Sequence, residues 1–301
     1  MANISLNGTR LHYEDTGPAA RGEAIVFSHG LLWSTRLFGR QIADLQDRWR
    51  CVAYDHRGQG QSAESDLGSI SMDLLYEDAV ALIEALDLGP VHFCGFSMGG
   101  FVGLRLAARR PDLVRSLILL DTAARAEHPF RVPFYKSMNY VSRWLGHEIV
   151  MDQVMRLTFG RHVRSDPCRA AECQAWREQL VSNRQTIWRA VNGVIDRTSV
   201  EDELTAISAP TLVVVGDEDK TTPAADAERM CDLISDTRLV RIANAGHAAL
   251  LERPGVVNGA IATFLQSVGE PASMPRPPQD VLLVSGIRPR QYRKPSRLSN
   301  F

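Results

Sequence analysis

The sequence predicts an α/β fold: a mostly parallel, twisted sheet with helices on both faces and an inserted helical cap. Short apolar runs typical of buried strands alternate with segments of helical spacing over residues 24–120 and again over 211–268. Such alternation indicates a parallel sheet that is covered on both faces. Between the two stretches, from Arg125 to about Glu203, there is no strand-like run.

The first half of the chain begins with a hairpin signal. Asn7-Gly8 lies between two short alternating runs, 4–6 and 11–13, and this dipeptide favours a tight two-residue turn. Apolar runs then predict strands at 24–28, 51–54, 91–94 and 117–120. Apolar residues with helical spacing predict helices at 71–88 and 98–109, which end at Gly89-Pro90 and before Pro111.

The middle of the chain has the character of a helical insertion. Its helical spacings occur at 150, 154 and 157 and at 187, 191, 194 and 195, and it holds three of the five tryptophans. Strands are predicted again at 211–215 and 238–242, with helices at 224–233 and 256–268. We therefore expect a core formed by residues 1–124 and 204–269 and a helical cap formed by 125–203.

Residues 270–301 differ in composition from the rest of the chain. They contain six prolines, six Lys or Arg residues and two acidic residues, which gives this segment a net charge of +4. Pro-rich basic segments are usually disordered, so we expect a disordered tail.

Overall composition excludes several classes of protein. The 301 residues carry a formal net charge of −1, so no global basic field indicates nucleic-acid binding. No apolar run approaches the roughly 18 residues of a membrane span, and the first ten residues do not resemble a secretory signal. Five scattered cysteines fit a reducing compartment, so we expect a cytoplasmic protein. Cys168 and Cys173 lack further ligands for zinc, and no metal is expected.

The strongest chemical signal is Gly95-Phe96-Ser97-Met98-Gly99, which lies where a predicted strand meets a predicted helix. In that context G-x-S-x-G is a nucleophile elbow, which raises the serine hydroxyl above the sheet. The turn is strained, and only residues without Cβ should fit at 95 and 99. The Met98 N–H, at the start of the helix, is positioned to donate to an oxyanion.

A serine nucleophile needs a base and an acid that orients the base. The base we expect is His247, which follows a late strand and is preceded by a glycine. The acid we expect is Asp219, in the Gly216-Asp217-Glu218-Asp219 loop after the strand at 211–215. Asp217, more typical of a turn, and Asp121, at the end of another strand, remain alternatives.

Together these motifs resemble the α/β-hydrolase superfamily across residues 1–269. The shared patterns are His29-Gly30, D-x-R-G-x-G-x-S at 55–62, the elbow with Gly100, G-x-x-D-x-x-x-P at 216–223 and Gly246-His247. The order Ser97, Asp219, His247 is also that of the superfamily. The sequence is most similar to 3-oxoadipate enol-lactonases, small carboxylesterases and cofactor-free haloperoxidases. Dehalogenases and most epoxide hydrolases of this fold carry Asp at the elbow, so Ser97 argues against both.

The resemblance also implies a second oxyanion donor in the loop after the strand at 24–28. We expect it to be the Leu31 N–H, with Gly30 allowing the backbone to approach the substrate. The 55–62 loop lacks the ending of a phosphate-binding loop. We interpret it as a structural loop in which Asp55 and Arg57 make buried polar contacts.

The function predicted from these residues is a serine hydrolase that cleaves a small-molecule carboxylic ester or lactone through an acyl-enzyme, without metal or organic cofactor. Five aromatic residues are expected to bind the substrate: Trp33, Phe38 and Phe96 from the core, and Trp144 and Trp188 from the cap. The alternatives are a C–C bond hydrolase of vinylogous diketones, a perhydrolase or haloperoxidase, and a non-catalytic receptor. The oligomeric state, including a homo-oligomer, is left open.

Overall fold

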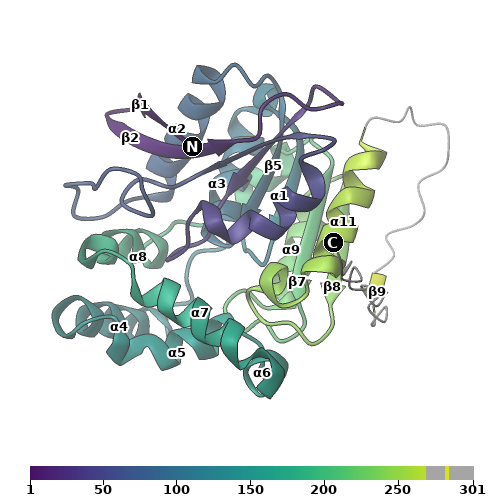
Figure 1. The fold of residues 1–301 in the computed structure, drawn as a ribbon. Coiled ribbons are helices and arrows are strands. Elements are labelled where there is room, and N and C mark those ends of the chain that lie inside the picture. Colours follow the sequence, from purple (N-terminus) through teal and green to yellow (C-terminus); the bar gives the residue numbers. More distant parts are fainter. Residues whose placement is uncertain (269–281, 285–301) are drawn as a thin grey trace, which may run out of the picture.

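The computed structural model describes residues 1–268 and 282–284, and a nine-stranded sheet runs through this part of the chain (Figure 1). The strand order is β1-β2-β4-β3-β5-β6-β7-β8-β9. Strand β2 pairs antiparallel with β1 and β4, and all other neighbours are parallel, so the prediction of a mostly parallel sheet is confirmed. The strands are β1 (Ala2–Leu6), β2 (Thr9–Asp15), β3 (Ala24–Ser28), β4 (Arg50–Tyr54), β5 (Val91–Phe96), β6 (Val114–Leu120), β7 (Thr211–Gly216), β8 (Thr237–Ile242) and β9 (Leu282–Val284).

The first two strands form the predicted hairpin. Asn7 and Gly8 have φ angles of 44° and 69°, the positive values that a type I′ turn requires at both central residues. The register pairs Leu6 with Thr9 across this two-residue loop.

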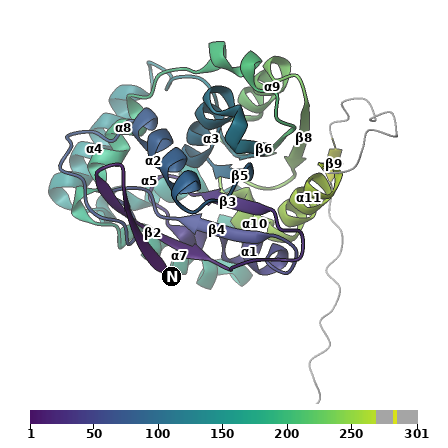
Figure 2. The same cartoon turned by 90° about the horizontal axis from the view of Figure 1, so that it is seen from above.

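Helices cover both faces of the sheet, as predicted (Figure 2). One face packs against α2 (Met72–Ala85), α3 (Met98–Arg109) and α9 (Ala224–Leu233). The other packs against α1 (Gly39–Leu45), α10 (Ala249–Glu252) and α11 (Pro254–Ser267). Because side chains alternate along a strand, Val26 belongs to the first apolar cluster while Ile25 and Phe27 belong to the second.

Helical segments alone connect β6 to β7, and they lie below the sheet in Figure 1. They are α4 (Val132–Leu145), α5 (Glu148–Thr158), α6 (Arg161–Arg164), α7 (Ala170–Val181) and α8 (Trp188–Ile195). Short 3-10 helices are η1 (Thr35–Phe38), η2 (Pro111–Leu113), η3 (Pro167–Arg169), η4 (Gln185–Ile187) and η5 (Glu201–Ala206). No strand lies between β6 and β7, as the sequence predicted. The division into a core and a cap at 124/125 and 203/204 stays a prediction.

Within the segment expected to be a disordered tail, Leu282–Val284 form strand β9. This strand pairs in parallel with Val240–Ile242 of β8, so for these three residues the expectation is wrong. An apolar run of high strand propensity completes a sheet edge that would otherwise present unpaired backbone groups. The rest of the expected tail, 270–281 and 285–301, lies outside the described residues.

None of the helices within residues 1–268 is both long enough and apolar enough to cross a lipid bilayer.

Candidate active site

Ser97 lies at the tight connection between β5 and α3. Its φ of 49° and ψ of −111° are strained for a residue with a side chain. A Cβ at Gly95 would lie 2.3 Å from the Gly99 carbonyl oxygen, and a Cβ at Gly99 would lie 1.9 Å from that of Ser28. The prediction that only glycine fits at both positions is therefore confirmed.

The Ser97 hydroxyl is hydrogen bonded to His247. The Ser97 Oγ–His247 Nε2 distance is 2.9 Å. His247 comes from the loop after β8 and is 7% exposed, with the Phe96 ring 5.3 Å from its own ring. A buried histidine at this distance can accept the serine proton.

Asp219 holds the other side of the histidine. Its Oδ2 lies 2.8 Å from His247 Nδ1, so Nδ1 donates to the carboxylate and Nε2 is free to accept from Ser97. The Thr221 and Thr222 N–H groups donate to Asp219 Oδ1, and the Thr222 hydroxyl donates to Oδ2. The structure thus brings together the three residues expected to be catalytic. Asp217, the turn alternative, instead forms an ion pair with Arg241.

Thr222 was not singled out from the sequence. Its position three residues after Asp219, in the same loop, is the sequence feature that could have indicated this contact.

Asp121, the other alternative acid, contacts the loops rather than the histidine ring. It is fully buried after β6, and its two carboxylate oxygens accept from the N–H groups of Gly216 and Ala249. Burial, together with the negative charge of Asp219, raises the pKa of the Asp121 carboxyl well above its usual value. Asp121 therefore joins the two loops that carry Asp219 and His247.

The two expected oxyanion donors flank Ser97. Met98 is the first residue of α3, where an N–H has no partner within the helix. Leu31 lies in the loop after β3 and lines the same cavity as Ser97. A Cβ at Gly30 would lie 2.6 Å from the Phe96 ring, which explains the glycine before Leu31. Their role as donors stays a prediction.

Gln59 links the loop that carries Leu31 to the first residue of α3, Met98. Its Oε1 accepts from the Leu32 N–H at 3.0 Å, and its Nε2 lies 3.7 Å from Met98 Sδ. Gln59 is 1% exposed. Sequence reasoning placed it in the structural 55–62 loop but did not foresee this bridge.

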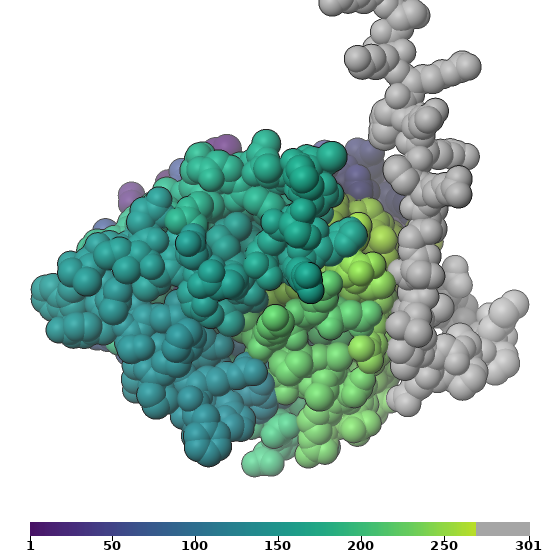
Figure 3. Space-filling view, turned by 90° about the horizontal axis from the view of Figure 1, so that it is seen from below, coloured from purple at the N-terminus to yellow at the C-terminus, as the bar shows by residue number. Residues whose placement is uncertain are grey.

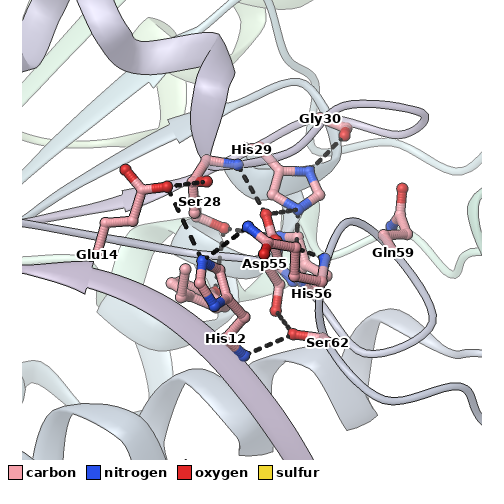
Figure 4. A network of polar contacts seen from close by, with 12 residues as sticks. His12, Glu14, Ser28, His29, Gly30, Asp55, His56, Gln59 and Ser62 are labelled. Atoms are coloured by element: carbon pink, nitrogen blue, oxygen red, sulfur yellow. Dashed lines mark hydrogen bonds and ion pairs between the residues drawn. The ribbon is translucent and has the colours of Figure 1, made fainter. Parts of the chain in front are cut away.

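A buried polar network holds the loop after β3 from below (Figure 4). His29 Nδ1 donates to the Gly30 carbonyl, and His29 Nε2 accepts from the His56 N–H at 3.0 Å. Burial lowers the pKa of His29, although Asp55 partly opposes this, and the neutral ring satisfies both bonds. Asp55 also accepts from the Thr35 N–H at 2.7 Å.

The predicted buried contacts of the 55–62 loop are confirmed. In addition to the Asp55 contacts, Arg57 Nε donates to Asp78 Oδ2 at 2.6 Å, and both side chains are buried.

Ser97 and His247 open onto a cavity of about 190 Å³ between the sheet and the helices α4–α8. Two of the five aromatic residues expected to bind substrate, Trp33 and Phe96, line it. The remaining walls are mainly aliphatic side chains from the connecting helices, including Met138, Val150, Met151, Val154, Leu157, Leu180, Ile187, Val191 and Val194. Several of these are the residues whose helical spacing predicted the helices. The apolar face that this spacing defined is therefore the face that lines the cavity.

The other three aromatic residues do not line this cavity, so the structure does not bring them to the candidate site. Phe38 is fully buried and packs against Phe27 at 4.9 Å in the core. Trp144 faces outward and is 63% exposed. Trp188 lies under the Arg143 guanidinium, 3.8 Å from the ring centroid. The position of a residue around its helix determines whether its side chain faces the cavity or the solvent, and the residue type alone does not predict that position.

Within the described part of the chain, no group of three or more His, Cys, Asp or Glu residues is arranged to hold a metal ion.

Comparison with known proteins places this geometry in a family context. Residues 19–254 match the family described as serine aminopeptidase, S33. The chain is 27% identical over 263 residues to 3-oxoadipate enol-lactonase 2 of Acinetobacter baylyi, an alignment that covers 87% of this chain and 96% of the relative. The range matched by the family, 19–254, includes Ser97, Asp219 and His247.

Solved structures resemble the whole described fold. The enol-lactonase from Burkholderia xenovorans LB400 aligns with a TM-score of 0.79 at 26% identity, covering 88% of this chain and 100% of that chain. A thermophilic esterase from Thermogutta terrifontis aligns with a TM-score of 0.81 at 27% identity, covering 90% and 100%.

Proposed function

The chain belongs to the serine aminopeptidase S33 family of α/β hydrolases, and we propose that it cleaves small carboxylic esters or lactones through an acyl-enzyme on Ser97. The observation that carries the proposal is the continuous hydrogen-bonded path from Ser97 Oγ through His247 to Asp219, at the edge of a mainly aliphatic cavity. Two similar proteins bear the names enol-lactonase and esterase, which agrees with this chemistry.

In the proposed reaction, His247 Nε2 takes the Ser97 proton while Ser97 Oγ attacks the substrate carbonyl carbon. The Leu31 and Met98 N–H groups stabilise the oxyanion. His247 then gives its proton to the leaving alkoxide, and the acyl group remains on Ser97. His247 then takes a proton from a water molecule, whose oxygen attacks the acyl carbon. The bond from that carbon to Ser97 Oγ breaks, the carboxylic acid leaves, and His247 returns the proton to Ser97 Oγ. Asp219 keeps Nδ1 protonated and stabilises the imidazolium.

The cavity argues against an aminopeptidase, despite the family's description. A substrate amino terminus is a cation and needs a carboxylate that is free to receive it. Among the described residues that line the cavity, Glu127 is the only carboxylate, and it is buried in an ion pair with Arg197 at 3.1 Å. Aliphatic walls fit an uncharged acyl group better.

The first test is a pre-steady-state burst with p-nitrophenyl butyrate. We expect a burst equal to the enzyme concentration, and labelling of Ser97 by a fluorophosphonate that peptide mass spectrometry locates. Ser97→Ala should lose both, with kcat reduced on the order of 10⁶-fold, as when a serine-protease triad is broken. Turnover by Ser97→Ala close to that of the wild type would overturn the proposal.

The second test separates the bond types with a panel of substrates. It compares kcat/KM for butyryl and phenylacetyl esters, a five-membered enol lactone, a meta-cleavage diketone and an alanine p-nitroanilide, and it measures peracid formation with added peroxide. Highest kcat/KM on esters or lactones supports the proposal. A diketone or anilide preferred by 100-fold or more would instead assign C–C or peptide-bond cleavage to the same residues.

A further inference from the structure

The outward surface of the connecting helices carries an unusual concentration of exposed apolar side chains. The described residues include eight large hydrophobic side chains that are exposed, and six of these fall within residues 130–149. We call these six the α4 patch: Phe130, Phe134, Tyr140, Trp144, Leu145 and Ile149, which are between 45% and 89% exposed. The helical segment that carries them forms the near surface in the view of Figure 3.

The patch exists because α4 is apolar on opposite faces. Tyr135, Met138 and Asn139 face inward and line the catalytic cavity. Tyr140 and Trp144 lie on the opposite side of the helix and are exposed, with their ring centroids 6.4 Å apart, and the exposed Phe134 lies between the two faces. A surface helix normally has one apolar stripe, so the second stripe indicates that something covers it.

The summed exposed area of the six side chains is close to that of one side of a protein interface. With about 200 Å² for a fully exposed large side chain, the six residues expose on the order of 700 Å² of mostly apolar surface. The largest patch on a typical monomer is roughly 300–600 Å². A standard stable interface buries about 800 Å² on each partner.

The charges around the patch favour a second copy of this chain over a lipid surface. Arg131 and Arg143 lie on α4 or directly before it and have no carboxylate partner among the described residues. Glu148 and Asp152, in the first half of α5 near Ile149, both pair with Arg177, but their side chains stay more than 60% exposed. Both signs are thus present, at different parts of the same surface. A two-fold axis can bring the cations of one copy to the carboxylates of the other, whereas an anionic bilayer would repel the carboxylates.

We propose that two copies of this chain associate through the α4 patch, around a two-fold axis that packs α4 against its symmetry mate. This proposal does not depend on the reaction catalysed.

Sedimentation velocity tests the proposal. From 0.1 to 100 µM the full chain should sediment as a dimer, or as a monomer–dimer equilibrium in this range. Trp144→Lys with Leu145→Lys, and separately Tyr140→Lys, should weaken dimerisation at least 100-fold. The matched control is Leu67→Lys, which changes an exposed apolar residue at a distant place in the sequence and should leave the dimer intact.

Folding of each variant is checked by far-UV circular dichroism and by hydrolysis of a short ester, which should both match the wild type because the substituted side chains lie at the surface. A wild-type chain that stays monomeric at 100 µM overturns the proposal, as does a dimer that survives both patch variants. A monomer that co-sediments with phosphatidylglycerol vesicles through the same residues would also overturn it and would assign the patch to lipid.

Discussion

The backbone around Ser97 leaves no space for a side chain at the two neighbouring glycines, Gly95 and Gly99. The serine needs a strained backbone to present its hydroxyl above the sheet, and that strain persists only because α3 packs closely on β3 and β5. Gly99 is the point of closest approach, since its Cα hydrogen faces the Ser28 carbonyl where a Cβ would lie at 1.9 Å.

Gly99→Ala should therefore destabilise the protein by several kcal/mol, because either α3 or β3 must move and the core cannot absorb the shift. The measurement is the free energy of unfolding in urea. The matched control is Gly259→Ala in the exposed part of α11, where a Cβ meets nothing within 4 Å. That control should be neutral or stabilising by up to about 1 kcal/mol. Equal effects of the two substitutions would contradict this account of the packing.

The two carboxylates near His247 have separable tasks. Asp219 bonds the imidazole, whereas Asp121 bonds the backbone of both loops that present Asp219 and His247. Substitution by asparagine tests each task with little change in volume.

Asp219→Asn should lower kcat by about 10⁴, since an amide favours the wrong imidazole tautomer, as in the serine-protease triad. Asp121→Asn loses one of its two acceptors, and a small displacement of the loops should cost on the order of 10²-fold. Steady-state kinetics on a p-nitrophenyl ester distinguishes them. The reverse ranking would make Asp121 the acid that orients the base.

At the scale of elements, the sequence was most informative where periodicity and turn chemistry agree. The hairpin turn lies at Asn7-Gly8 as predicted, and the helices at 98–109 and 224–233 have the predicted bounds. Pro111 follows the first of these helices closely, and Pro223 directly precedes the second. Strand β5 runs on to Phe96, past Gly95, because that glycine is needed for close packing and does not break the strand.

Sequence patterns did not predict the elements that depend on contacts between distant parts of the chain. Helix α1 is a short segment, Gly39–Leu45, whose buried residues are Gln41 and Leu45, so its pattern is too brief to read. Strand β9 depends on an unpaired edge at β8 that no local sequence reveals. The orientation of Trp144 and Trp188 likewise follows from how α4 and α8 pack together.

Strand β9 should contribute to stability but not to chemistry. Two truncated chains that both lack 285–301 isolate it, one ending at residue 284 and one at residue 268. Loss of the β8 pairing should lower the unfolding free energy by about 1–3 kcal/mol and Tm by a few degrees. The ratio kcat/KM should agree within about twofold, since no residue of the candidate site is touched. Identical Tm values for the two chains would show that the pairing adds no stability.

For the molecule as a whole, the junction between the α4–α8 segment and the sheet contains a buried carboxyl. Glu252, in α10, accepts hydrogen bonds from the N–H of Gly160, between α5 and α6, and from that of Gly246, next to His247. The side chain is buried, with the carboxylate of Glu218 and the guanidinium of Arg169 as charged neighbours. Burial is the main cause that raises the pKa of Glu252 to about 7.

This shift makes stability depend on pH in a definite direction. In the unfolded chain Glu252 titrates at its ordinary pKa of 4.5, so the folded state binds more protons between about pH 4.5 and 7. The contribution is fully present below pH 4.5 and is lost as pH rises through about 7, so this group makes the protein less stable toward pH 8.

Glu252→Gln removes the titration while keeping an acceptor oxygen for the two N–H groups. Relative to the wild type, the variant should therefore gain on the order of 1–3 kcal/mol of unfolding free energy between pH 5 and pH 8. Urea unfolding at half-unit pH steps measures this difference, and Glu228→Gln, at an exposed position of α9, serves as the surface control. A difference that is constant with pH, or that falls as pH rises, would mean that Glu252 is held as a carboxylate by the amides of Gly160 and Gly246 in the folded protein.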